Sequence, residues 1–412
     1  MNAPLGIGII GSGFNARFHI QAFQAVRDAE IRGIYSPTAA NAQATAAYAR
    51  SLDVGPTKTY TSITEMVSDP QIDAIWLNGP NHARVENVEE IIHALQSGRA
   101  SLKGIACEKP LARNLQEANR ILELVQQAGI AHGYLENQVF APHLARGKHI
   151  IWARGAATTG RPYLARAAEE HSGPHMPWFW QGQLQGGGVL NDMMCHSALV
   201  IRHLLTEPGR LRQSLRPRMV TGHIASLKWT RPDYARQLQQ RMGAAVDYTN
   251  NPAEDYASIM VQFESEDGSR VLGEATTSWS YVGAGLRLSA ELLGPEYSMR
   301  WNSLDSGLQL FFSREVRGQQ GEDLVEKQNA ESGVMPVVPD EAAAYGYEAE
   351  DRHFVRVFLG KEQPQLTFED GAEVVRVLMA AYKSAEAGRT IDIDAVDLET
   401  FVPMVAQGSW RP

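Results

Sequence analysis

The sequence predicts an α/β protein of two domains: an N-terminal Rossmann dinucleotide-binding domain and a C-terminal α+β domain with an open, mostly antiparallel sheet. Three observations predict this. Residues 5 to about 140 alternate short apolar runs with helical patterns. A glycine-rich turn follows the first apolar run. Beyond about residue 145, alternating apolar and polar residues become frequent. We therefore expect domains at 1–145 and 146–412.

The N-terminal part has the pattern of consecutive βα units. Apolar runs predict strands at residues 5–10, 30–35, 73–78, 104–108 and 131–135. Apolar residues spaced three and four apart predict helices at residues 39–51, 84–97 and 115–128. Parallel strands need such crossover helices, so this order predicts a parallel sheet.

The C-terminal part mixes strands with helices. Alternating runs predict strands within residues 162–170, 256–279 and 287–294. Helical patterns occur at residues 191–205, 234–242, 349–360 and 370–388. The polar stretch 317–333 is expected to form an exposed excursion with little to bury.

Composition excludes several classes of protein. The chain has 412 residues, of which 44% are hydrophobic, enough for two domains. Its net charge of −9 disfavours a nucleic-acid partner. Cys107 and Cys195 lack the spacing of a disulfide framework or zinc site, which predicts no metal and a reducing compartment. The sequence shows no secretion signal and no apolar run of about 20 residues. We expect a soluble cytoplasmic protein without a membrane partner.

The first strand is followed by the turn that dinucleotide-binding domains use. Gly11 permits a tight turn, Gly13 lets a pyrophosphate approach the backbone, and Ala16 replaces the third glycine of the pattern. The N-terminus of the next helix offers N–H groups to the phosphates. An ordinary glycine turn is the alternative interpretation.

The second strand leaves the choice of cofactor open. An acidic residue usually follows it to hold the ribose of NAD, but this chain has Tyr35 followed by Ser36, Pro37 and Thr38. Ser36 and Thr38 can donate to the 2′-phosphate of NADP, yet no Arg or Lys stands beside them. We expect NAD or NADP, with NAD slightly favoured. Arg17 either reaches the phosphates or is a solvated residue of the helix face.

Two further motifs carry candidate chemistry. Lys109 follows the strand at residues 104–108, and ligands of parallel sheets bind beyond such strand ends. There it can exchange a proton with a hydroxyl group; the alternative is a surface lysine. Asp192 and His196 stand four residues apart, so they share one helix face and can address one hydroxyl. The alternative is a capped helix with a core histidine.

Taken together, the motifs resemble those of the glucose–fructose oxidoreductase and inositol 2-dehydrogenase family, Gfo/Idh/MocA. The resemblance rests on GSGFNA after the first strand, NGPNH at 78–82, CEKPLA at 107–112, GGGVLNDMMCH at 186–196 and the closing EDRHFVRVFLG. It implies catalytic roles for Lys109, Asp192 and His196. The cofactor-binding residues expected here are Gly11, Gly13, Phe14, Asn15, Ser36, Thr38, Asn78, Pro80, Asn81, His82, Glu108, Lys109 and Asn137.

The resemblance has departures and further implications. Met194 stands where the family usually has glycine, and Arg84 where a histidine often lies. The family also implies that the outer face of the second sheet mediates oligomers, so we expect a homodimer or homotetramer.

The segment 171–180 is rich in aromatic residues, Pro and Gly. Its aromatic faces can pack on sugar rings, which makes it a candidate pocket wall; the alternative is a loop anchored to the core. The expected substrate-binding residues are Lys109, Gln138, His171, Trp178, Trp180, Asp192 and His196.

These expectations favour an NAD(P)-dependent oxidoreductase acting on a carbinol carbon of a sugar, polyol or sugar derivative. In the mechanism we expect, Lys109 takes the hydroxyl proton, assisted by His196 with Asp192. One alternative is a redox-neutral, NAD-dependent glycoside-cleaving enzyme, for which Tyr163 and Tyr281 are candidate additional acid–base groups. A second alternative is a non-catalytic NAD(P)-binding sensor.

Overall fold

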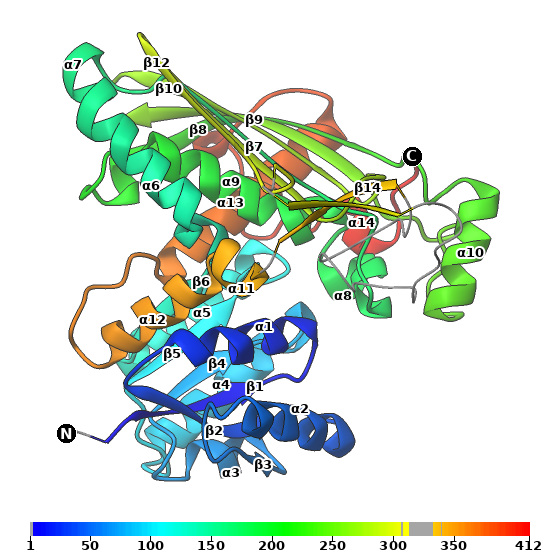
Figure 1. Ribbon diagram of the computed structural model, residues 1–412. Helices are drawn as coiled ribbons and strands as arrows, with labels where there is room; N and C mark the ends of the chain where they lie inside the picture. Colours follow the sequence, from blue (N-terminus) through cyan, green and yellow to red (C-terminus); the bar gives the residue numbers. More distant parts are fainter. Residues whose placement is uncertain (1–2, 306–307, 313–332, 339) are drawn as a thin grey trace. The chain divides into compact units, whose positions relative to one another are not determined.

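The computed structural model describes residues 3–305, 308–312, 333–338 and 340–412 (Figure 1). The polar excursion expected at residues 317–333 lies outside the described residues, apart from Gly333. The chain forms two compact units. The first unit consists of Met1–Ala112, Gln116–Pro142 and Ala342–Glu373, and the second unit of Arg113–Leu115, His143–Glu341 and Val374–Pro412.

The first unit contains a six-stranded parallel sheet in the order β3-β2-β1-β4-β5-β6. The strands are β1 Leu5–Ile10, β2 Ala29–Tyr35, β3 Lys58–Tyr60, β4 Ala74–Leu77, β5 Gly104–Glu108 and β6 Ala131–Leu135. Strands β1, β4 and β5 are buried along their whole length, which explains their continuous apolar sequences. The predicted Rossmann sheet is confirmed. Its strand order reverses between β1 and β4, the point where such sheets bind ligands.

Helices flank this sheet. They are α1 Phe14–Ala22, α2 Ala39–Ser51, α3 Ile63–Val67, α4 Arg84–Gln96, α5 Leu115–Ala128 and α12 Tyr347–Phe358. The predicted helices at residues 39–51, 84–97 and 115–128 are confirmed to within one residue.

Helix α12 changes the expected domain boundary. It contacts α1, and Figure 1 shows it, in orange, among the blue and cyan elements of the first unit. A Cβ on Gly104 of β5 or Gly133 of β6 would lie 2.2 Å from the rings of Phe358 and Phe354 respectively. Residues 342–373 therefore pack with the first unit, whereas the sequence placed all of 146–412 in the second domain. The reason is tertiary: these phenylalanines fit over glycines more than 200 positions earlier.

The second unit contains a seven-stranded sheet in the order β12-β11-β7-β10-β9-β8-β15. The strands are β7 Leu164–Glu170, β8 Leu215–Ala225, β9 Tyr256–Ser265, β10 Arg270–Ser278, β11 Arg287–Gly294, β12 Tyr297–Asn302 and β15 Ile391–Asp392. Only β7 and β10 pair in parallel; the other neighbours are antiparallel. The expected mostly antiparallel sheet is confirmed. A separate antiparallel pair consists of β13 Leu308–Phe312 and β14 Gly333–Val337.

Helix α9, Val189–Leu205, is the central helix of the second unit. Every one of its residues is buried, and it packs on β7, β9 and β10. Helix α13, Phe368–Ala387, also packs on this sheet, because a Cβ on Gly222 of β8 would lie 2.4 Å from the Ala381 carbonyl oxygen. The other helices are α6 Pro142–Ile150, a π-helical turn Ile151–Ala156, α7 Ala157–Thr159, α8 Gly182–Gln185, α10 Pro232–Met242, α11 Glu341–Ala344 and α14 Met404–Gln407. Among the described residues, no helix is long and apolar enough to span a membrane.

Candidate active site

The turn after β1 has the geometry that its glycines predict. Gly11 has a φ of +115°, and a Cβ there would lie 2.8 Å from the carbonyl carbon of Asn78. Gly13 precedes α1, and a Cβ there would meet nothing within 4 Å. No side chain caps α1, and no acidic residue occupies its first turn. The N-terminal N–H groups of α1 are therefore available to an anion.

Asn78, just after β4, supplies a second indication of a bound group. Both polar atoms of its side-chain amide are buried and have no hydrogen-bond partner among the described residues. A buried amide without a partner is unfavourable, so this side chain is suited to a polar ligand. Beside β2, the Ser12 hydroxyl donates to the Ser36 hydroxyl at 2.8 Å. These features fit the phosphates and ribose of a dinucleotide.

The remaining predicted cofactor residues of the first unit lie on the same loops. Phe14 is 39% exposed at the start of α1, and Thr38 is exposed just before α2. Pro80 and Asn81 lead into a 3-10 turn, Asn81–Ala83, in which Asn81 is buried and His82 half-buried.

The backbone of Lys109 is fixed on both sides. Its N–H donates to Glu108 Oε2 at 3.0 Å, and its carbonyl accepts from Arg84 Nη2 at 3.1 Å. The buried Arg84 also donates from Nε to the Gly79 carbonyl at 3.3 Å. The residue that departs from the family pattern thus holds the lysine in place.

Two predicted cofactor residues have partners within the protein. Glu108 is 3% exposed, and its Oε1 lies 3.0 Å from His19 Nε2. The Asn137 amide donates to the Tyr345 carbonyl at 2.8 Å. Both side chains are buried in the first unit, and their cofactor-binding roles stay predictions.

In the second unit, α9 carries Asp192 and His196 on one face, as predicted. Asp192 Oδ2 accepts from Trp279 Nε1 at 3.2 Å. His196 Nε2 lies 3.6 Å from Glu169 Oε2 on β7. Both α9 side chains are only 4% exposed, so each is held by a specific neighbour. No local pattern marks Trp279 or Glu169 as functional, since the fold brings them to Asp192 and His196 from distant positions in the chain.

The glycine run before α9 has a structural cause. Glu254 Oε1 accepts from the N–H groups of Gly188 and Leu190 at 2.9 and 3.1 Å, and from the Tyr382 hydroxyl at 2.6 Å. A Cβ on Gly188 would lie 2.7 Å from the Glu254 carboxyl carbon. Burial raises the pKa of Glu254 to about 7. A buried carboxyl group thus caps the helix that carries Asp192 and His196.

The aromatic segment divides into a core part and an accessible part. Trp180 is 2% exposed; its ring packs against Trp279 at a centroid distance of 5.0 Å, and its Nε1 donates to the Pro174 carbonyl at 3.0 Å. The Trp180 ring therefore packs in the core, as the alternative interpretation of this segment expects, and its role in substrate binding stays a prediction. Trp178 is half-buried and stacks on Phe179 at 3.8 Å.

Two other predicted substrate residues are buried. His171 is 4% exposed, and its Nδ1 accepts from the Gly173 N–H at 2.9 Å, so the ring proton of the neutral form lies on Nε2. Gln138 is 5% exposed in the first unit, where its N–H donates to Glu136 Oε1 at 3.3 Å.

Tyr163, a candidate acid–base group for glycoside cleavage, lies at the wrong end of β7. It directly precedes β7, whereas Glu169 is the last residue but one of the strand. Six residue-to-residue steps along the strand separate Tyr163 from Glu169 by roughly 20 Å. Tyr163 therefore cannot act together with His196, which faces Glu169.

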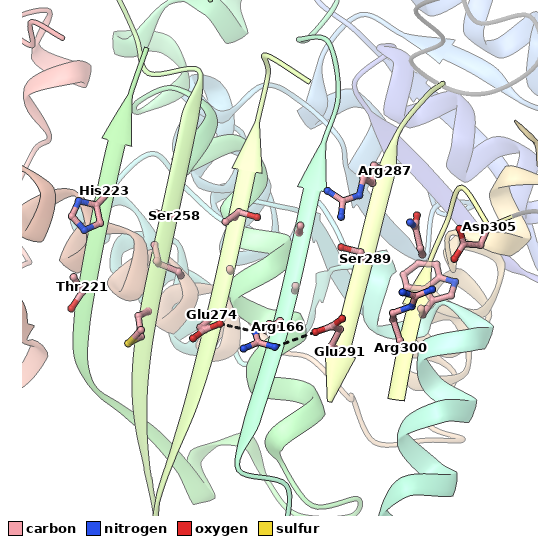
Figure 2. Close-up of a pocket in the computed structure, with 18 residues that line it drawn as sticks. Arg166, Thr221, His223, Ser258, Glu274, Arg287, Ser289, Glu291, Arg300 and Asp305 are labelled. Atoms are coloured by element: carbon pink, nitrogen blue, oxygen red, sulfur yellow. Dashed lines mark hydrogen bonds and ion pairs between the residues drawn. The ribbon is translucent and has the colours of Figure 1, made fainter. Parts of the chain in front are cut away.

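The outer face of the second-unit sheet carries a hollow of about 640 Å³ (Figure 2). Arg166 on β7 lies between Glu274 on β10 and Glu291 on β11, with N–O distances of 2.7 and 3.3 Å (Figure 2). Arg287, Arg300 and Asp305 also line the hollow. This face is charged with both signs.

Family models match both halves of the chain. A model described as an oxidoreductase family with an NAD-binding Rossmann fold matches residues 5–134, and one for the GFO/IDH/MocA C-terminal domain matches residues 155–300. The chain belongs to the Gfo/Idh/MocA family. As a member it is an oxidoreductase, and its first unit carries the NAD-binding Rossmann fold of that family.

Individual relatives agree with this assignment. The chain is 26% identical to a 1,5-anhydro-D-fructose reductase of Ensifer adhaerens, over 94% of this chain and 98% of the relative. It is 28% identical to a levoglucosan dehydrogenase of Pseudarthrobacter phenanthrenivorans, over 49% of this chain and 52% of that protein. A similar solved fold is GenD2 from gentamicin A biosynthesis in complex with NAD, with a TM-score of 0.75, 22% identity and coverage of 95% and 97% of the two chains.

Proposed function

We propose that this enzyme transfers a hydride reversibly between a nicotinamide dinucleotide and a carbinol carbon of a sugar, polyol or sugar derivative. The observation that carries the proposal is the combination of a Lys109 backbone fixed on both sides with an Asp192–His196 pair held by Trp279 and Glu169. The relatives named as a reductase and a dehydrogenase of sugar derivatives support this substrate class.

In this proposal Lys109 takes the proton of the substrate hydroxyl. Glu108 and Arg84 hold its backbone, so only the side-chain torsions have to be ordered for the transfer. Asp192 accepts a hydrogen bond from a substrate hydroxyl, and Trp279 keeps its carboxylate in one orientation. The nicotinamide, when bound, supplies the hydride acceptor.

His196 is proposed to exchange a proton with the same substrate. Glu169, 3.6 Å from its Nε2, stabilises the protonated ring. If His196 and Lys109 serve one chemical step, their single and double alanine variants lose activity non-additively, which steady-state kinetics can measure.

NAD is the proposed cofactor. The Ser36 hydroxyl accepts from Ser12, and the exposed Arg17 guanidinium lies over the Tyr48 ring at 4.5 Å. A 2′-phosphate needs a cation beside these residues. Isothermal titration with NAD and NADP tests the proposal, and tighter binding of NADP would contradict it.

Turnover assays test the reaction class. Incubation with either cofactor across free sugars, inositols and glycosides should give reduced cofactor in proportion to oxidised product. Aglycone release without reduced cofactor would instead show the redox-neutral glycoside-cleaving reaction. Cofactor binding without turnover of any compound would show a sensor.

We also propose that the chain self-associates through the outer face of its second-unit sheet. Arg166, Glu274 and Glu291 present both charges, so a second copy can offer opposite charges to them. Met260, 45% exposed on the same face, adds apolar surface. Light scattering should give a dimer or tetramer for the wild type and a smaller species for Met260→Glu; a wild-type monomer would contradict the proposal.

The proposed location is the cytoplasm. Cys107 and Cys195 are buried and form no disulfide, which fits a reducing compartment. Fractionation of the source cells tests this, and recovery from a secreted fraction would contradict it.

A further inference from the structure

We propose that His19 is a positioning residue: a buried imidazolium that holds the Glu108 carboxylate, and through it the backbone of Lys109. The inference rests on the proposed role of Lys109 and adds a residue that neither the motifs nor the proposed mechanism uses. It concerns the first unit alone.

His19 lies on α1 with no exposed surface, between two carboxylates. Its Nε2 is 3.0 Å from Glu108 Oε1 at the end of β5. Its Nδ1 is 2.8 and 3.0 Å from the two oxygens of Asp351 on α12. Asp351 Oδ1 also accepts from Trp76 Nε1 at 2.8 Å, which fixes that carboxylate.

Counting protons assigns the charge of the ring. A neutral imidazole has one N–H and one lone pair, and the lone pair cannot accept from an ionised carboxylate. Because both nitrogens face a carboxylate oxygen within 3.0 Å, an imidazolium satisfies both contacts. Burial opposes this charge, but Asp351 and Glu108 outweigh burial and raise the pKa of His19 well above its ordinary value.

The surrounding groups leave this charge in place. Glu350, beside Asp351 on α12, is fully buried, and its two carboxyl oxygens have no hydrogen-bond partner among the described residues. Burial raises the pKa of Glu350 well above its ordinary value; the neighbouring carboxylates act in the same direction and His19 opposes them, which favours the neutral form of Glu350. The Glu136 carboxylate contributes to the raised pKa of Glu350, and the Lys109 ammonium helps to lower the pKa of Glu108. The Tyr347 ring contacts the His19 ring edge-on, at a centroid distance of 5.2 Å.

Glu108 transmits the restraint to Lys109. One carboxylate oxygen of Glu108 contacts His19, and the other accepts the Lys109 N–H at 3.0 Å. With both oxygens engaged, the carboxylate cannot rotate without losing a charged hydrogen bond. His19 also lies on the helix whose first turn faces the proposed phosphates, so one side chain links cofactor helix and catalytic loop.

The first experiment observes the ring directly. In protein labelled with ¹⁵N-histidine, the resonance lost in His19→Gln should remain that of an imidazolium, with both nitrogens protonated, from pH 6 to pH 8. His132 is the control: burial lowers its pKa, so its ring should lose its proton at a lower pH than the His19 ring does. A His19 ring that is neutral at pH 7, or a stoichiometric metal ion in the purified protein, would overturn the proposal.

The second experiment separates positioning from folding. His19→Gln should lower kcat about 10- to 100-fold with little change in KM, because a small displacement of a reacting group has that effect. Adding Asp351→Asn removes one of the uncompensated buried charges, so the double variant should regain Tm but not kcat. If kcat recovers together with Tm, His19 is only structural.

A Lys109→Ala variant keeps the two proposals distinguishable. If it retains turnover, the proposed function fails, yet the imidazolium resonance of His19 is unaffected. If it loses turnover while His19→Gln folds and remains fully active, the proposed function stands and the positioning role is wrong.

Discussion

The hydrogen bond between Trp279 and Asp192 in the second unit gives a prediction about kcat. The Trp279 indole N–H is the donor that orients the Asp192 carboxylate, at 3.2 Å. Trp279→Phe should keep the ring packing and lower kcat about tenfold, since a hydrogen bond to a carboxylate contributes roughly 1.5–3 kcal/mol.

The matched control is Trp152→Phe. Trp152 donates to the Leu204 carbonyl at 2.9 Å, at the other end of α9. It should change Tm but not kcat. Equal kcat values for Trp279→Phe and wild type would show that Asp192 does not depend on this contact.

Alanine substitutions at the two glycines of the first turn should have different effects on the stability of the free protein. Gly11→Ala forces a side chain into a φ of +115° and against Asn78, so it should destabilise the protein without any cofactor present. Gly13→Ala meets only open space, so it should leave the Tm of the free protein unchanged.

NAD affinity distinguishes the roles of these glycines. If phosphates approach the backbone at Gly13, its alanine variant should raise the Kd for NAD at least about tenfold, a loss of about 1.4 kcal/mol. Calorimetric titration measures this directly. An unchanged Kd would place the pyrophosphate elsewhere.

Helix α9 gives a prediction at the scale of an element. Glu254 caps it with a pKa raised from 4.5 to about 7. Between these two values the folded state keeps a proton that the unfolded state has lost. The stability that this proton contributes is full below pH 4.5, falls as the pH rises to 7 and is absent above, a change of roughly 3 kcal/mol.

The variant Glu254→Gln tests that pH dependence. It keeps an oxygen acceptor for Gly188 and the Tyr382 hydroxyl but cannot ionise. Its free energy of unfolding should therefore vary less than that of the wild type between pH 4.5 and 7. Glu266→Gln, an exposed change in the same unit, should follow the wild type. If the free energies of unfolding of Glu254→Gln and wild type change with pH in the same way, titration of Glu254 does not cause the pH dependence.

The local sequence pattern was enough to predict the limits of strands and helices whose burial or periodicity is uniform. Strands β1, β5, β6 and β11 and helices α2 and α5 have the predicted limits, because continuous burial or steady periodicity marks their ends. The three-residue β3 and the irregular β8, with its register shift between Pro217 and Met219, lack such marks and were missed.

The candidate site was predictable only where chemistry follows the local sequence. Lys109, Asp192 and His196 stand in motifs, so their residues could be named in advance. Residues that support these motifs, His19, Asp351, Trp279 and Glu254, come from distant segments, and their local sequence does not indicate the contacts they make. Packing decides these positions, as it also decided that Trp180 is a core residue.

At the scale of the whole molecule, the two units carry different parts of one proposed reaction. The first unit supplies the dinucleotide turn and Lys109, and the second supplies Asp192 and His196. Mutations in the first unit should affect cofactor binding or proton transfer. Mutations of Asp192 or His196 in the second unit should affect substrate recognition. Comparing Kd for NAD with KM for substrate across the variants tests this division, and a loss of NAD binding in Asp192→Asn would contradict it.

The most direct test of the central claim is hydride transfer by Lys109→Ala. With saturating NAD and the best sugar or polyol found for the wild type, the rate of NAD reduction should fall about 10²- to 10⁴-fold. Lys103→Ala, an exposed lysine paired with Asp73 in the same unit, should behave as wild type. A folded Lys109→Ala enzyme that reduces NAD at a near-normal rate would contradict the account.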